Sequence, residues 1–163
     1  MASRRAAAVL IGLLLGTVML GRPAVAQNDS HAGYYYPIPQ SSEVYHARAR
    51  TLAEADRSLR IGFVTGITNQ LLSRPYAPTM AMFAKGDDAQ KLIIVALEEG
   101  RISTLYRARA VFAELTSVAR VMPIFKELGV QEWFTFFDLA KLLGFQQITI
   151  SDGDRFAHQV TID

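Results

Sequence analysis

Histidine is the side chain most often used for acid–base chemistry and metal binding near neutral pH, and this chain contains three. His31, His46 and His158 are widely separated, with no pair four residues apart and no nearby acid at a spacing typical of a metal site. His158 follows a turn and shares a predicted strand face with apolar side chains. A hydrogen-bonded structural histidine is the favoured interpretation there, and a general base is the alternative. The histidines therefore predict neither a catalytic residue nor a metal site.

Basic residues supply the best candidate for a ligand site. Four basic residues lie in or after turns that we expect near one end of the central strands: Lys85, Arg101, Arg107 and Arg109. His158 is the fifth candidate residue of this anion site. Together these side chains could bind an anion, and the alternative is an ordinary solvated basic face. Lys85-Gly86 is not a phosphate-binding loop, because the preceding glycines of that motif are missing.

Other catalytic signatures are missing from the sequence. It has no G-x-S-x-G motif around a serine and no cysteine, so thiol catalysis and cysteine-bound metals are excluded. Asp152, Asp154 and Ser151 could hold a cation, but Asp-Gly at this point is explained by turn formation alone. The sequence favours a non-catalytic binding or accessory domain without a cofactor. It leaves open a hydrolase or transferase whose residues meet only in three dimensions.

The first 26 residues have the pattern of a secretory signal peptide. Arg4 and Arg5 precede an apolar run over residues 9–20, and Ala24-Val25-Ala26 is typical of a cleavage site. We expect a periplasmic or secreted protein after cleavage following Ala26, with no stable membrane anchor. An uncleaved anchor is the alternative, and the arginine pair leaves general and twin-arginine export both open.

Removal of this segment changes the charge of the protein. The whole chain has 17 basic and 15 acidic residues, but three of the arginines lie before the cleavage site. The remaining 137 residues therefore have a net charge of −1, and the basic isoelectric point belongs mainly to the segment that is removed. This balance argues against nucleic acid as a partner. It leaves a periplasmic protein or a small ligand as the expected partner.

The first half of the expected domain gives the weaker structural signals. Residues 27–40 are rich in tyrosine and proline and predict an extended tail. Residues 41–60 have possible serine caps and several alanines, which predict a partly helical segment. From Leu59 to Ile67, apolar residues alternate with Arg60 and Gly62, which predicts a strand. A loop is expected over residues 69–78.

The second half gives stronger signals. Residues 79–84 and 92–97 predict two strands around a turn, and the second is apolar enough to be buried on both faces. From Leu105, apolar residues repeat every three or four positions, which predicts a helix that ends or restarts at Pro123. Thr135 and Asp138 form a capping box for a further helix that ends at Gly144.

The C-terminus predicts a β-hairpin around Asp152-Gly153. Of two possible registers, we favour the one that closes on Asp154 and places Ile150 opposite Phe156, because it keeps the apolar residues on one face. Residues 41–163 are thus expected to form a single α+β domain. We predict a mainly antiparallel sheet of about five strands, with two to four helices and a terminal hairpin.

Several segments carry a resemblance that covers nearly the whole chain after residue 26. They are RIGFVTGIT at residues 60–68, MFAKG at 82–86, LIIVAL and TLYRARAVFAELT, and TFFDLAKLLGFQQITISDGDRFAHQV. These segments resemble a family of small exported bacterial proteins, some of which are labelled molybdopterin-guanine dinucleotide biosynthesis protein A. The enzyme of that name is a cytoplasmic nucleotidyltransferase with a glycine-rich loop, and nothing here matches that loop. The resemblance implies export and an α+β domain, and the label suggests an accessory role in molybdenum cofactor metabolism. It supplies no catalytic residue.

Overall fold

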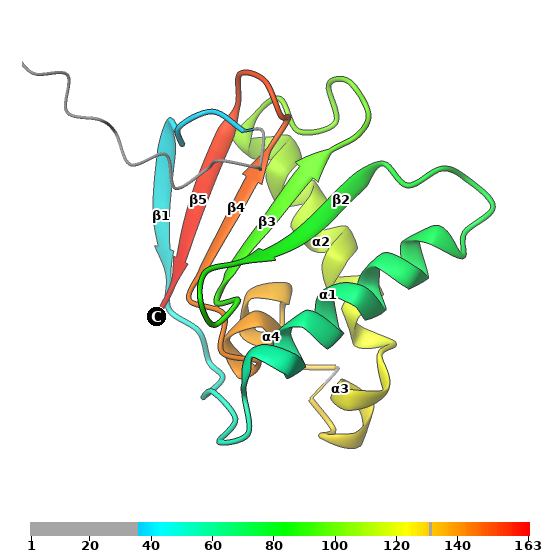
Figure 1. The fold of residues 1–163 in the computed structure, drawn as a ribbon, viewed down its shortest axis with the longest axis vertical. Helices are drawn as coiled ribbons and strands as arrows, with labels where there is room; N and C mark the ends of the chain where they lie inside the picture. The colour runs from blue at the N-terminus through cyan, green and yellow to red at the C-terminus, as the bar shows by residue number, and fades with distance from the viewer. Residues whose placement is uncertain (1–35, 131) are drawn as a thin grey trace, which may run out of the picture. The chain divides into compact units, whose positions relative to one another are not determined.

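The computed structural model describes residues 36–130 and 132–163, which form the α+β domain shown in Figure 1. The predicted signal peptide at 1–26 and most of the predicted tail at 27–40 lie outside these residues. Within the described part of the chain, a five-stranded mixed sheet is combined with four helices, so the predicted fold class is confirmed. None of the described helices is both long and apolar enough to cross a membrane.

The sheet has the strand order β1-β5-β4-β3-β2. Its two hairpins, β2–β3 and β4–β5, are antiparallel, and the ladders β3–β4 and β1–β5 are parallel. The strands are β1 (Ser41–Tyr45), β2 (Met80–Lys85), β3 (Lys91–Ala96), β4 (Gln147–Ser151) and β5 (Ala157–Ile162). β1 and β2 are therefore the two edges of the sheet, and β1 forms the left edge in Figure 1.

The helices pack against one face of this sheet. They are α1 (Arg57–Leu72), α2 (Leu105–Arg120), α3 (Pro123–Glu127) and α4 (Phe136–Leu142), and α2 passes behind the sheet in Figure 1. The sheet contributes Leu92, Ile94, Ile148, Ile150 and Val160 to the core, all without exposed surface. Ile93 points to the opposite face and is also buried, so the prediction that β3 is buried on both faces is confirmed.

The strand predicted from Leu59 to Ile67 is wrong, because these residues lie within α1. Asp56 is the N-cap of this helix, and its side chain accepts a hydrogen bond from the amide of Leu59 at 2.7 Å. The apparent alternation arose by coincidence, since Ile61 is partly exposed while Phe63 and Ile67 share the buried face. Arg60 is buried as well, and its Nε donates to the carbonyl of Asp88 at 2.7 Å.

The partly helical segment predicted for residues 41–60 is also wrong. Ser41–Tyr45 forms the parallel edge strand β1, and α1 begins only at Arg57. The partner strand β5 lies more than a hundred residues later, so nothing local in the sequence specifies this pairing. A short strand that is mostly polar carries no apolar periodicity strong enough to be recognised.

The later elements follow the prediction closely. α2 begins at Leu105 and buries Ala108, Phe112 and Leu115. α4 has the complete capping box between Thr135 and Asp138. It ends in a Schellman motif: Gly144, at φ 81°, donates its amide to Lys141, and the amide of Phe145 donates to Ala140 at 3.0 Å.

The terminal hairpin forms, but its predicted register is wrong by two residues. Ile150 lies opposite His158 instead of Phe156, so the loop spans residues 152–156. Asp152 explains the longer loop, because its Oδ1 accepts hydrogen bonds from three successive amides, at residues 154–156, over 2.8–2.9 Å. A shift of two residues keeps each side chain on its predicted face, and Gly153 has the expected positive φ, 82°.

Candidate functional site

The structure separates Lys85 from the arginines of the predicted anion cluster, of which Arg101 and Arg107 line one hollow of about 300 Å³. Lys85 is the last residue of β2 and lies opposite Lys91 at the start of β3, whereas Arg101 follows the other end of β3. Arg101 forms an ion pair with Glu114, and Arg107 donates a hydrogen bond to the carbonyl of Gly100. The expectation that Lys85 joins the arginines at one end of the strands is therefore wrong, because β2 runs antiparallel to β3.

His158 and Arg109 also come together, through residues that the sequence analysis missed. His158, whose side chain is 2% exposed, has its Nδ1 2.8 Å from the hydroxyl of Ser41. Its Nε2 lies 3.4 Å from Glu43 without a hydrogen bond, and Glu43 pairs with Arg109 at 3.1 Å. Ser41 and Glu43 were missed because they belong to β1, which carries no local strand signal.

A groove of about 620 Å³ lies between β1 and α2. Residues 43–45 of β1 line one side, and the face of α2 between Arg109 and Arg120 lines the other. Thr135 and Phe137 also line it. This volume is within the range of ligand sites in proteins.

The wall of the groove combines aromatic rings with charged groups. The ring of Phe137 lies 4.7 Å from the rings of both Phe112 and Tyr45, measured between centroids. Arg109 and Arg120 extend the lining on the α2 side. Apolar surface with a few charged groups is typical of ligand-binding and active sites alike.

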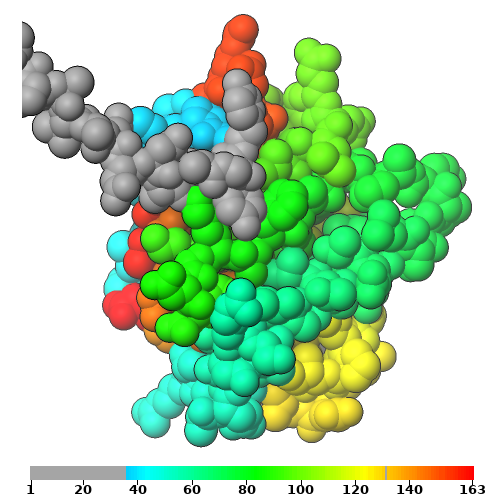
Figure 2. Space-filling view, viewed as in Figure 1, coloured from blue at the N-terminus to red at the C-terminus, as the bar shows by residue number. Residues whose placement is uncertain are grey.

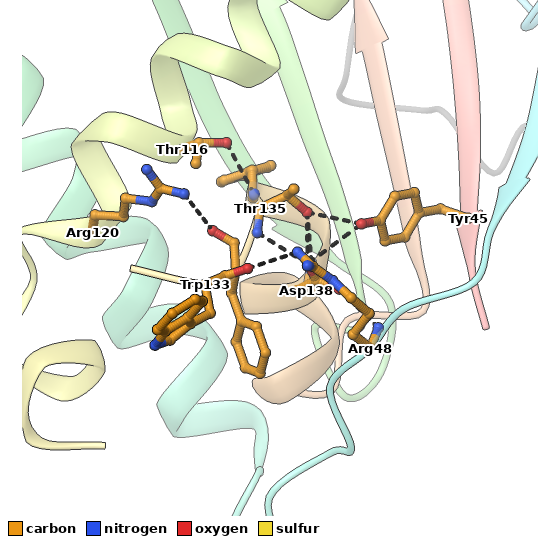
Figure 3. Close-up of polar contacts among 9 residues, drawn as sticks. Tyr45, Arg48, Thr116, Arg120, Trp133, Thr135 and Asp138 are labelled. Atoms are coloured by element: carbon orange, nitrogen blue, oxygen red, sulfur yellow. Dashed lines mark hydrogen bonds and ion pairs between the residues drawn. The ribbon is translucent and has the colours of Figure 1, made fainter. Parts of the chain in front are cut away.

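A hydrogen-bond network around Asp138 holds the end of the groove beyond Tyr45 (Figure 3). The backbone amide of Arg48 donates to Asp138 Oδ1 at 2.8 Å, and Arg48 Nη2 donates to Oδ2 at 2.7 Å. The hydroxyls of Tyr45 and Thr135 lie 3.0 Å apart. On the other side of Thr135, Arg120 donates to the carbonyl of Phe134 at 3.2 Å. These contacts fix β1 and the loop after it against α4.

The network keeps Asp138 ionised. Burial alone raises the pKa of this carboxyl, but hydrogen bonds from Arg48 and Thr135 outweigh burial and lower the pKa below its usual value. The pKa of Arg48 is raised, chiefly by its side-chain hydrogen bond to Asp138. A carboxylate that is fully enclosed and already accepts several hydrogen bonds is a structural group and a poor general acid.

A second hollow, of about 590 Å³, lies between α1 and the start of α3. Figure 2 shows the first turns of α1 lying against the segment that carries α3. Its lining is mainly apolar, from Leu59, Phe63 and Ile124, with Glu54 and Asp56 beside them. Its described lining includes no histidine and no basic side chain. Nowhere in residues 36–130 and 132–163 do three metal-ligating side chains gather.

Comparison with known proteins adds no family to this description. No family model, no curated protein and no solved structure matches the chain. The resemblance to small exported bacterial proteins stays a prediction, and the groove is the feature on which a function can be proposed.

Proposed function

We propose that this chain is an exported, non-catalytic domain that binds a partner protein in the groove between β1 and α2. The observation that carries the proposal is the position of that groove at an edge of the sheet. Residues 43–45 of the edge strand form one wall, and an exposed face of α2 forms the other. Export is expected from the signal-peptide pattern of residues 1–26.

The composition of the groove favours binding over chemistry. Interfaces are enriched in aromatic residues and arginine, and the lining includes Phe112, Phe137 and Arg120. Its one acidic side chain, Glu43, is already paired with Arg109 at 3.1 Å. The lining therefore presents surface and charge to a partner without a poised acid–base pair.

Selection of binders tests this proposal directly. A random linear peptide library would be selected against the immobilised domain beginning at Gln27, and the recovered peptides would be measured against an Ala113→Trp variant. Ala113 is exposed and lines the groove, so the indole fills the groove without removing a polar contact. We expect peptide binding to weaken at least about tenfold.

The matched control is Ala110→Trp, which adds the same side chain to α2 at an exposed position outside the groove lining. This variant should bind the selected peptides like the original protein. A library that yields no binder, or binders equally sensitive to both variants, would show that the groove is not the binding site.

A second candidate function is hydrolysis, and the Ser41–His158–Glu43 arrangement favours it. The hydroxyl of Ser41 contacts one nitrogen of His158, and a carboxylate lies near the other nitrogen, which is the order of groups in a catalytic triad. A fluorophosphonate reagent distinguishes the two functions. Labelling that is lost in Ser41→Ala and kept in Ser42→Ala would establish Ser41 as a nucleophile. If the original protein is not labelled, hydrolysis is contradicted and binding stays the proposed function.

A further inference from the structure

We infer that the groove binds its partner by strand addition: an extended segment with an acidic side chain pairs with the outer edge of β1. This inference rests on the proposed function and specifies the conformation and the charge of the bound segment. Three features of the described residues support it. They are the backbone groups on the outer edge of β1, the length of the groove, and the presence of one arginine that is not paired with a carboxylate.

The backbone of β1 offers hydrogen bonds along its outer edge. Asp163 donates its amide to the carbonyl of Tyr45 at 3.0 Å, and Ala47 donates to the carbonyl of Asp163 at 2.8 Å, so the odd-numbered residues face β5. The amides and carbonyls of Ser42 and Val44 consequently face away from the sheet. None of the described residues pairs with this edge. An added strand satisfies such a row of groups, which is the principle of β-augmentation.

The groove has the length that such a strand requires. β1 has 5 residues, which span about 16 Å in an extended chain. Arg109 and Arg120 lie about 16 Å apart along the axis of α2, at 1.5 Å per residue. α2 runs in the same direction as β1, because Glu43 contacts Arg109 while Tyr45 contacts Thr135 near the far end of the groove. Alternate side chains of an added strand would therefore point toward α2.

Charge selects the kind of segment. Arg48 is engaged with the carboxylate of Asp138, and Arg109 with Glu43. Among the described residues, Arg120 donates one hydrogen bond, to the carbonyl of Phe134, and its buried Nε has no hydrogen-bond partner. A carboxylate entering the groove would satisfy this guanidinium with a charge-assisted bond. The partner segment is therefore expected to place an acidic side chain or its C-terminal carboxylate beside Arg120.

Proline substitution tests the backbone pairing. Val44→Pro removes an amide that faces outward, so it breaks no bond to β5, and proline is tolerated on edge strands. We expect the variant to fold and to bind the tightest library peptide about tenfold more weakly, whereas Val44→Thr keeps the outward amide and should bind clearly more tightly than Val44→Pro. Circular dichroism and thermal unfolding establish that both variants are folded.

A peptide made with single N-methylated amides supplies an independent measurement. Because every second amide of a strand faces its partner, N-methylation should weaken binding at alternate positions and leave the positions between them unaffected. Equal tolerance at all positions, with binding still lost in Ala113→Trp, would overturn strand addition while the proposed function stands. If Ala113→Trp leaves peptide binding unchanged, both strand addition and the proposed binding function of the groove are contradicted.

The charge expectation is measured with Arg120→Gln. The selected peptides should contain an acidic residue or need their free C-terminal carboxylate, and Arg120→Gln should weaken them about tenfold, while the exposed Arg57→Gln of α1 has no effect. Peptides without a carboxylate requirement would contradict the role of Arg120. A dimeric domain whose Val44 amide is protected from hydrogen exchange would show that a second copy occupies the edge, which also overturns the inference.

Discussion

The carboxylate of Asp138, which has no exposed surface, lies 2.7 Å from the guanidinium of Arg48, which is more than half exposed. The pair joins the loop after β1 to the first turn of α4 across 90 residues of sequence. The same carboxylate accepts the amide of Thr135 at 3.0 Å, so one side chain both caps a helix and anchors the edge strand. Asp138 therefore helps to fix the geometry of the groove.

Asp138→Asn should lower the free energy of unfolding by about 2 kcal/mol at neutral pH, because it weakens charge-assisted hydrogen bonds to a buried group. The pKa of Asp138 is lowered in the folded protein, so its carboxylate stabilises the fold above the unfolded pKa of about 3.9. This contribution is lost as the pH falls below that value through the folded pKa.

Urea unfolding measured across this acid range checks the effect. The difference between the original protein and Asp138→Asn should shrink as the pH falls below about 4. The exposed Asp154→Asn serves as the control and should change little at any pH. A difference that stays constant into strong acid would show that the charge of Asp138 does not contribute to stability.

Two glycine substitutions should change stability in opposite directions. Gly144→Ala should lower the free energy of unfolding by about 1–2 kcal/mol or more, because φ is 81° and the new Cβ would lie 2.6 Å from Arg60 Nη1. Gly62→Ala should raise it by about 0.5–1 kcal/mol, since this helical position has open space around the added methyl. Thermal unfolding compares the two. A stabilised Gly144→Ala would show that the Schellman motif is misassigned.

The loop of the terminal hairpin should depend on Asp152. Asp152→Ala removes the acceptor of three amide hydrogen bonds and should destabilise the protein by about 1–2 kcal/mol. Asp152→Asn retains an acceptor oxygen and should recover most of this loss. Asp154→Ala, whose side chain is exposed, provides the comparison within the same loop. Equal stability of the alanine variants at 152 and 154 would contradict the role of Asp152.

Export provides a prediction that is independent of the groove. The protein recovered from fractionated cells should begin at Gln27, because the apolar run and Ala24-Val25-Ala26 are typical of a cleaved signal peptide. Intact-mass measurement of the periplasmic fraction checks the cleavage point. Full-length protein in the cytosol would contradict both the localisation and the exported role.

Local sequence determined the elements whose signals act over a few residues. The capping box of Thr135 and Asp138 and the glycine that ends α4 form as predicted. The hairpin at Asp152-Gly153 also forms, with a positive φ at Gly153 but with a longer loop than predicted. Their physical causes are short-range: a side chain caps a nearby amide, or glycine adopts a positive φ. Hydrophobic periodicity also determined α2. Its apolar residues recur every three or four positions, which is the spacing of one face of a helix.

Only the tertiary structure decided the edge of the sheet and the groove beside it. β1 exists because β5 pairs with it and because Asp138 anchors the loop that follows, and both partners lie about a hundred residues away in the chain. The start of α1 was predicted as a strand because its apolar residues fit both the two-residue period of a strand and the 3.6-residue period of a helix. In the folded protein, Phe63 and Ile67 are buried together on one face of a helix. Glu43 and Arg109 meet only after both elements are placed, since long-range contacts, unlike caps and turns, leave no local pattern in the sequence.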